Sequence, residues 1–142
     1  MADISDLAHR AGQIMDEARN RVLAPFGLTP RQYLLLQCFA AADGISQTDA
    51  VDATGVDRST LADVTRRLLG NGFIRRKRTR HDARRYEIRV TEHGMSVLEK
   101  AKPLIAAADA AVLGGLSDIE QTRLSLMLEK IAAPPARNGK AA

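Results

Sequence analysis

Two short helix-forming segments joined by a glycine turn, within residues 46–69, constrain the fold of this sequence more than any other feature. Ser46, followed three residues later by Asp49, has the form of a capping box, which predicts that a helix begins there. Gly55 suits the positive φ of a tight turn, and Asp57 can cap a second helix. Two short helices joined by a turn that contains glycine are typical of a helix-turn-helix.

Further helices are predicted before this pair. Apolar residues recur at three- and four-residue spacing over residues 4–22, which predicts an amphipathic helix. Thr29 and Gln32 form another capping box, with Pro30 at the first helical position, and the helix that begins there runs to about Ala41. Because this helix is apolar on most of its sides, we expect it to be central and buried.

A β-hairpin is predicted after the helix pair. Tyr86, Ile88 and Val90 alternate with polar residues, which is the period of a half-buried strand. Residues 73–79 provide the other strand, and the polar residues 80–84 form a basic tip.

The C-terminal part is predicted to be helical. Thr91 caps a long helix, which Pro103 should kink or restart and residues 113–115 should end. Ser117 opens a final helix, and residues 134–142 are expected to form a frayed tail. The chain of 142 residues fits one domain, mostly α-helical with a small β-hairpin wing, which is a winged helix-turn-helix.

Basic residues are concentrated in one quarter of the chain. The whole sequence has a formal net charge of +4, whereas residues 55–90 contain 11 basic and 4 acidic side chains, a balance of +7. A solvated charge run is one explanation. Because these basic residues overlap the predicted helix-turn-helix, the second explanation is favoured, namely that they form a surface that binds a polyanion.

Candidate DNA contacts lie on the outward side of the second helix and at the hairpin tip. If Leu61 points inward, the helix presents arginines and short polar groups, which suit base edges and phosphates. Asp63 has two interpretations, because it can accept a hydrogen bond from cytosine or hold Arg66 and Arg67 in position. The candidates are Arg58, Ser59, Thr60, Asp63, Arg66, Arg67, Arg80, Asp82, Arg84 and Arg85.

Duplex DNA is favoured over a single strand. Only five residues are aromatic, and four of them lie in apolar stretches, so the exposed stacking platforms of single-strand binders are not expected. The helix starts near Ser46 and Asp57 also offer backbone N–H groups to phosphates.

Three stretches resemble the MarR family of transcriptional regulators: Leu28–Leu36, Gly55–Ile74 and Asp82–Gly94. The third stretch contains the family's Asp-x-Arg wing at Asp82–Arg84 and its strand-to-helix junction at Val90–Gly94, where valine replaces the usual leucine. The order and spacing of the three stretches are what make the resemblance specific.

The resemblance implies a homodimer on a pseudo-palindromic operator, with recognition helices one DNA turn, about 34–36 Å, apart. We expect residues 26–98 to form the DNA-binding lobe and residues 1–25 and 99–133 the dimerisation helices. The apolar stripes of the first and last helices exceed what one small lobe needs to cover, although an intramolecular helix pair is the alternative. The expected dimer contacts are Ile4, Leu7, Ala11, Ile14, Leu124, Met127 and Ile131.

The resemblance also implies a mechanism. Asp82 would orient arginines of the wing or recognition helix, and Arg84 would enter the minor groove. Such regulators typically repress nearby genes until a small, often aromatic or phenolic, molecule binds between the dimer helices and the DNA-binding lobe.

Other functions have weaker support. Cys38 leaves a redox-sensing regulator of the same fold as the alternative, but it lies in an apolar stretch, where cysteines are usually inert. The three histidines are scattered, so neither a metal site nor another cofactor is expected. The sequence has no glycine-rich phosphate loop and no nucleophile with its base, so we do not expect an enzyme.

A cytoplasmic location is expected. The apolar runs are far shorter than the roughly 20 residues that cross a bilayer, and the first ten residues lack the features of a signal peptide. A single cysteine fits a reducing compartment.

Overall fold

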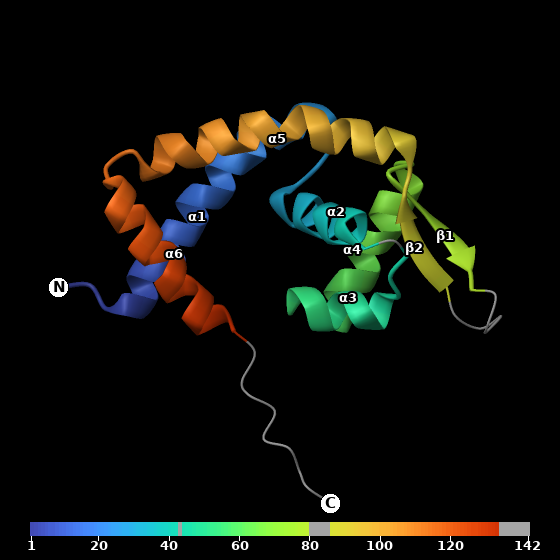
Figure 1. Cartoon of the computed structure of the whole chain (residues 1–142), viewed down its shortest axis with the longest axis horizontal. Coiled ribbons are helices and arrows are strands. Elements are labelled where there is room, and N and C mark those ends of the chain that lie inside the picture. The colour runs from blue at the N-terminus through green and yellow to red at the C-terminus, as the bar shows by residue number, and fades with distance from the viewer. Residues whose placement is uncertain (43, 80–85, 134–142) are drawn as a thin grey trace, which may run out of the picture.

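The computed structural model describes residues 1–42, 44–79 and 86–133. Figure 1 shows α1 and α6 on one side, the lobe of α2, α3, α4 and the hairpin on the other, and α5 spanning both. This arrangement confirms a mostly α-helical winged helix-turn-helix. In chain order the elements are α1 (Ile4–Leu23), a short 3-10 helix η1 (Ala24–Phe26), α2 (Pro30–Ala41), α3 (Gln47–Thr54), α4 (Arg58–Gly70), β1 (Ile74–Arg78), β2 (Tyr86–Val90), α5 (Glu92–Leu113) and α6 (Asp118–Ala132).

Side-chain caps fix where the helices begin. Each predicted cap accepts a hydrogen bond from the backbone N–H three residues further on, which satisfies one of the free donors of the first turn. The capping box is complete at the starts of α2 and α6. The confirmed caps are Thr29, Ser46, Asp57, Thr91 and Ser117.

The core lies between α2, α4, α5 and the hairpin. The inner stripe of α4 is buried as expected, with Leu61 and Leu68 at most 1% exposed. The expectation that α2 is central and buried is correct for the side that carries Leu35 and Phe39 and wrong for the other, since Leu34 is 46% exposed and Cys38 is half-buried. The lobe covers only one face of this helix.

The two strands pair antiparallel, and β2 is bridged to the segment that precedes α3. Ile74 pairs with Val90 and Arg78 with Tyr86. Ile45, just before α3, forms an isolated bridge with Ile88, which fixes the hairpin against the helix pair. The strands therefore hold a fixed position beside α3 and α4.

Helix α5 runs without a break through Pro103, and Figure 1 shows it as one gently arched helix. The expectation that the proline restarts the helix is wrong. Ala101 and Ile105, on either side of Pro103, are both buried, so core packing holds the two halves in line. No helix within the described ranges is long and apolar enough to span a bilayer.

Candidate nucleic-acid interface

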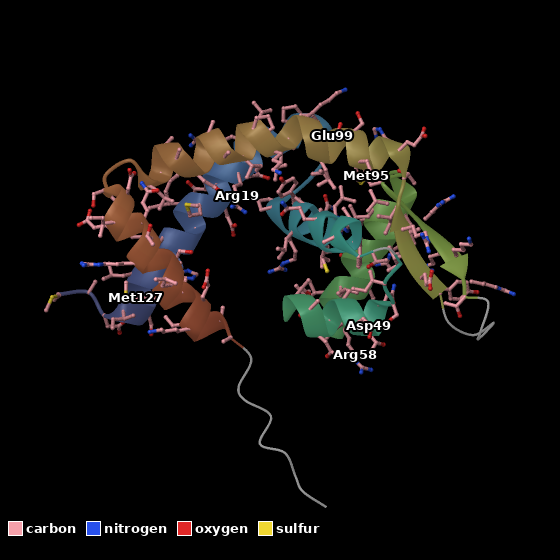
Figure 2. The ribbon with its side chains drawn as sticks, in the orientation of Figure 1. Arg19, Asp49, Arg58, Met95, Glu99 and Met127 are labelled. Atoms are coloured by element: carbon pink, nitrogen blue, oxygen red, sulfur yellow. The ribbon has the colours of Figure 1, made fainter. Side chains whose placement is uncertain are left out.

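The outer face of α4 presents the predicted cations to solvent. Arg58, Ser59, Arg66 and Arg67 are exposed, while Thr60 and Asp63 are partly exposed. In the view of Figure 2, Arg58 of α4 and Asp49 of α3 both lie at the foot of the lobe, on the side opposite α5. The sequence therefore predicted correctly which side of α4 faces solvent.

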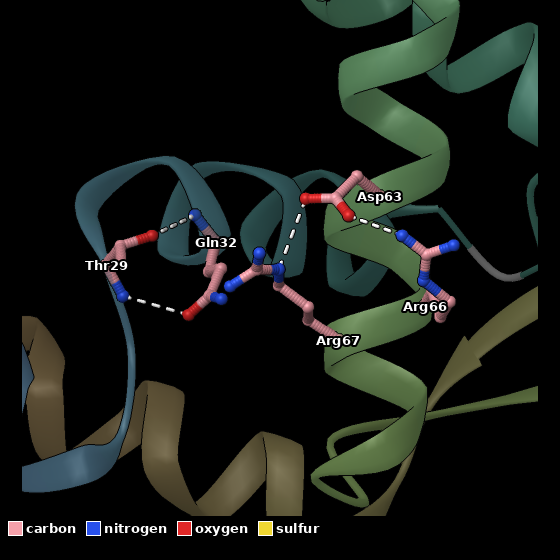
Figure 3. A network of polar contacts seen from close by, with 5 residues as sticks. All are labelled: Thr29, Gln32, Asp63, Arg66 and Arg67. Atoms are coloured by element: carbon pink, nitrogen blue, oxygen red, sulfur yellow. Dashed lines mark hydrogen bonds and ion pairs between the residues drawn. The ribbon is translucent and has the colours of Figure 1, made fainter.

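Asp63 contacts both neighbouring arginines of α4 (Figure 3). Its Oδ1 accepts a hydrogen bond from Arg66 Nη2 at 2.5 Å, and its Oδ2 accepts one from Arg67 Nε at 3.1 Å. The bond from Arg66 is the main reason that the pKa of the Asp63 carboxyl lies below its usual value. Of the two interpretations offered by the sequence, this geometry corresponds to the positioning of arginines.

Thr60, one of the candidate DNA contacts, is hydrogen-bonded to Asp57, the residue that caps α4. Asp57 accepts a hydrogen bond from the Thr60 backbone N–H at 2.9 Å and another from the Thr60 hydroxyl at 2.7 Å. These bonds lower the pKa of Asp57. The hydroxyl proton of Thr60 is therefore committed to the cap, and its oxygen remains as an acceptor.

The wing carries four exposed cations that are not among the predicted DNA contacts, and they alternate between the two faces of β1. All four residues from Arg75 to Arg78 are exposed on β1, and the Arg78 guanidinium lies 5.7 Å from the centre of the Tyr86 ring. The four consecutive basic residues in the sequence were a sufficient signal. Arg80, Asp82, Arg84 and Arg85, which were predicted at the tip, lie outside the described residues.

A hollow of about 420 Å³ separates the start of α3 from the wing. The wing contributes Arg76 and Tyr86, and α3 begins at its capping residue Ser46. The sequence predicted the helix start as a phosphate contact but did not place Arg76 beside it, because the two segments are 30 residues apart. The full lining is Ser46, Gln47, Thr48, Asp49, Arg76, Tyr86 and Ile88.

A second groove, of about 490 Å³, joins the first helix to the outer face of α4. Asp16 and Glu17 of α1 lie along one side, and Arg31 lies at the start of α2. Asp63 and Arg67 of α4 form part of the lining. A molecule in this groove would touch the same helix face that carries the candidate DNA contacts.

The far side of the molecule exposes apolar side chains that a single chain leaves uncovered. Ile4, Leu7 and Ile14 of α1 are 82%, 53% and 47% exposed. Met127 of α6, which is labelled in Figure 2, is 54% exposed. No residue of α6, Asp118–Ala132, is buried. Of the other expected dimer contacts, Ala11 and Ile131 are exposed and Leu124 is partly exposed.

The structure gives little support to the other proposed sensors. Burial raises the pKa of the Cys38 thiol, which lowers its thiolate fraction at neutral pH. Within the described residues, no three His, Cys, Asp or Glu side chains are grouped so that they could hold a metal ion.

Comparisons with known proteins point in one direction. A family model described as "MarR family" matches residues 26–85. The transcriptional regulator HosA of Escherichia coli is 32% identical over 104 residues, which are 73% of this chain and 77% of HosA. The HTH-type transcriptional repressor Rv2887 of Mycobacterium tuberculosis is 26% identical over 132 residues, or 93% of this chain and 95% of the repressor.

Solved structures agree with the sequence matches. The structure of Rv2887 in complex with p-aminosalicylic acid covers 93% of this chain and all of its own, at 25% identity and a TM-score of 0.72. A mutant of E. coli MarR in complex with operator DNA covers 93% of this chain and all of its own, with a TM-score of 0.85. At 22% identity, this second likeness is one of fold.

Proposed function

This chain belongs to the MarR family of DNA-binding transcriptional regulators, and from that membership we propose that it is a homodimeric repressor released from its operator by a small aromatic acid or phenol. One observation carries the proposal: the lobe built around the helix-turn-helix exposes Arg58, Arg66 and Arg67 of α4 and the cations of β1 to solvent. Exposed cations on a recognition helix and on a wing are the groups that a duplex-binding lobe needs for contacts with phosphates and base edges.

In this proposal α4 is the recognition helix. Arg58, Ser59 and Thr60 occupy its first turn, where base edges are within reach, and Arg66 and Arg67 lie in its later turns. The wing contacts the adjacent backbone or minor groove through Arg75–Arg78 and through Arg80, Asp82, Arg84 and Arg85 at the tip. The hollow beside Ser46 receives a phosphate, with Arg76 as its cationic partner.

The dimer is proposed from the uncovered apolar side of the molecule. Residues 1–25 and 99–133 would pair with the same segments of a second copy, which removes the exposed side chains of α1 and α6 from water. Residues 26–98 would form the DNA-binding lobe.

The effector is proposed to bind in the groove between α1, α2 and α4. Rv2887, a repressor by its name, has been solved with p-aminosalicylic acid. In this chain Arg31 and Arg67 line the groove and can receive a carboxylate of that kind. Since Arg67 belongs to α4, such a ligand would favour a position of the recognition helix that fits DNA poorly.

The test begins with a pool of random duplexes from which the purified protein enriches its preferred sequence. We expect a pseudo-palindrome, and a hydroxyl-radical footprint should show two protected patches about 10 base pairs apart or a multiple of that spacing. A thermal-shift screen of aromatic acids and phenols then identifies ligands that also lower operator affinity. Failure to enrich any sequence would contradict the proposal.

A further inference from the structure

Asp63 is an acid on the helix face that carries the candidate DNA contacts of α4. It is the only carboxylate within α4, Arg58–Gly70, and it lies on the outer face together with Arg66 and Arg67. A negative charge there repels the phosphates of any duplex, whatever its sequence. Its presence on this face therefore weakens general attraction to DNA.

The stability of the fold does not explain why an acid occupies position 63. The side chains of Arg66 and Arg67 are 75% and 65% exposed, and that of Asp63 is 42% exposed. Exposed ion pairs between neighbouring turns of a helix contribute little to stability, because water and salt screen them. A role in DNA recognition is the better explanation.

The contacts fix two long side chains in one geometry. Asp63 engages Arg66 through Nη2 and Arg67 through Nε, so each guanidinium keeps other N–H groups for a second partner. The two Nη groups of Arg67 remain for a bidentate contact such as the one that arginine makes with guanine O6 and N7. Both arginines are thereby biased toward DNA whose groups match these positions.

We propose that Asp63 is a positioning residue that determines sequence selectivity, by holding Arg66 and Arg67 in register for the operator and by penalising DNA that does not match. The proposal rests on the DNA-binding function argued above. Selectivity is a difference between two affinities, and a repulsive group that is compensated only in the correct complex increases that difference.

The experiment compares Asp63→Asn with the wild-type protein on two probes. One probe is the duplex enriched by the wild-type protein from a random pool, and the other is a shuffled duplex of equal composition. For Asp63→Asn we expect about three- to tenfold tighter binding to the shuffled duplex. The salt slope should be steeper by about 0.9 for each copy of the chain that contacts the duplex, equivalent to one further phosphate contact per copy. We expect no gain on the enriched duplex, so the ratio of the two affinities falls by the same factor of about three to ten.

Two variants separate positioning from net charge. Asp52→Asn removes the same charge from exposed Asp52 of α3 and should leave the affinity ratio within about twofold of wild type. Asp63→Glu keeps a carboxylate within reach of both arginines and should restore most of the selectivity. Circular dichroism checks that all three variants fold.

Three results would overturn the proposal. The affinity ratio of Asp63→Asn could equal that of wild type, or Asp52→Asn could lower the ratio as much. Alternatively, Asp63→Asn could relax the preference at a single C·G pair with no change on shuffled DNA, which would make Asp63 itself the group that reads the base. Failure of the wild-type protein to distinguish the two probes would instead count against the DNA-binding function as a whole.

Discussion

At the scale of single residues, Gly94 shows how closely the wing is packed against the start of α5. A Cβ on Gly94 would lie 2.2 Å from the Phe73 carbonyl oxygen and 2.6 Å from a methyl carbon of Val90. Thr91 holds the same junction, since its hydroxyl donates to the Gly72 carbonyl at 2.6 Å and accepts from the Gly94 N–H. The sequence motif indicated that a glycine belongs here, but the reason is a contact between backbones that only the fold brings together.

Gly94→Ala should therefore destabilise the protein by about 2 kcal/mol or more, because backbone rather than a flexible side chain must move. Gly70→Ala is the control, since a Cβ there meets nothing within 4 Å and should stabilise α4 by about 0.5–1 kcal/mol. Urea unfolding at a fixed protein concentration measures both changes. Equal effects of the two substitutions would contradict the close approach at Gly94.

The reactivity of Cys38 tests the alternative function, a redox-sensing regulator. Because burial raises the pKa of its thiol, iodoacetamide should modify Cys38 at pH 7.5 more slowly than it modifies the urea-unfolded chain. The rate should rise with pH, since the thiolate forms only as the pH approaches the raised pKa. Cys38→Ala should bind operator like wild type. Rapid modification, together with loss of DNA binding after peroxide treatment, would revive the redox sensor.

At the scale of helices and strands, the sequence predicted those features whose physical cause lies within a few neighbouring residues. Capping residues marked the starts of α2 to α6, because each cap bonds within its own first turn. The restart predicted at Pro103 was wrong for the opposite reason, since the burial of Ala101 and Ile105 depends on distant parts of the chain. The hollow beside the start of α3 and the groove beside α4 could not be predicted from the sequence for the same reason, because each is formed by segments that are distant in the chain.

The link between α1 and α5 is another contact that no sequence pattern indicates. Arg19 makes two hydrogen bonds to the Asp109 carboxylate, at 2.8 and 2.6 Å, across 90 residues of sequence. These bonds raise the pKa of Arg19, against the opposing effect of its partial burial.

Arg19→Ala should cost about 2 kcal/mol, because the partly buried Asp109 loses its charged partner. Arg21→Ala, at an exposed position in the last turn of the same helix, should change the free energy of unfolding by less than about 0.5 kcal/mol. Thermal unfolding at equal protein concentration distinguishes the two. If Arg19→Ala lowers the free energy of unfolding no more than Arg21→Ala does, the Arg19–Asp109 pair does not hold α1 against α5.

At the scale of the whole molecule, α1, α5 and α6 form a scaffold that exposes more apolar surface than an isolated chain is expected to leave in water. The apolar stripes of the sequence predicted which helices would carry that surface. The geometry of the pairing between two copies was beyond the patterns, because it depends on a second chain.

Analytical ultracentrifugation should find a dimer at micromolar concentration. Leu7→Glu should shift the equilibrium toward monomer, because it would place a charge among apolar contacts. Gln13→Glu adds the same charge at an exposed polar residue of α1 and should remain dimeric. A wild-type monomer, or equal weakening by both substitutions, would contradict the proposed interface.

The most direct test of the central claim is the dependence of operator affinity on salt. If the outer face of α4 and the wing bind duplex DNA in both copies of a dimer, a plot of log Kobs against log salt should have a slope of about −5 or steeper, since each neutralised phosphate contributes about 0.9. Arg66→Ala should make that slope shallower by about one or two, whereas Lys100→Ala, on α5, should leave it unchanged. A slope near zero, or equal losses for the two variants, would contradict the assignment of this surface to DNA.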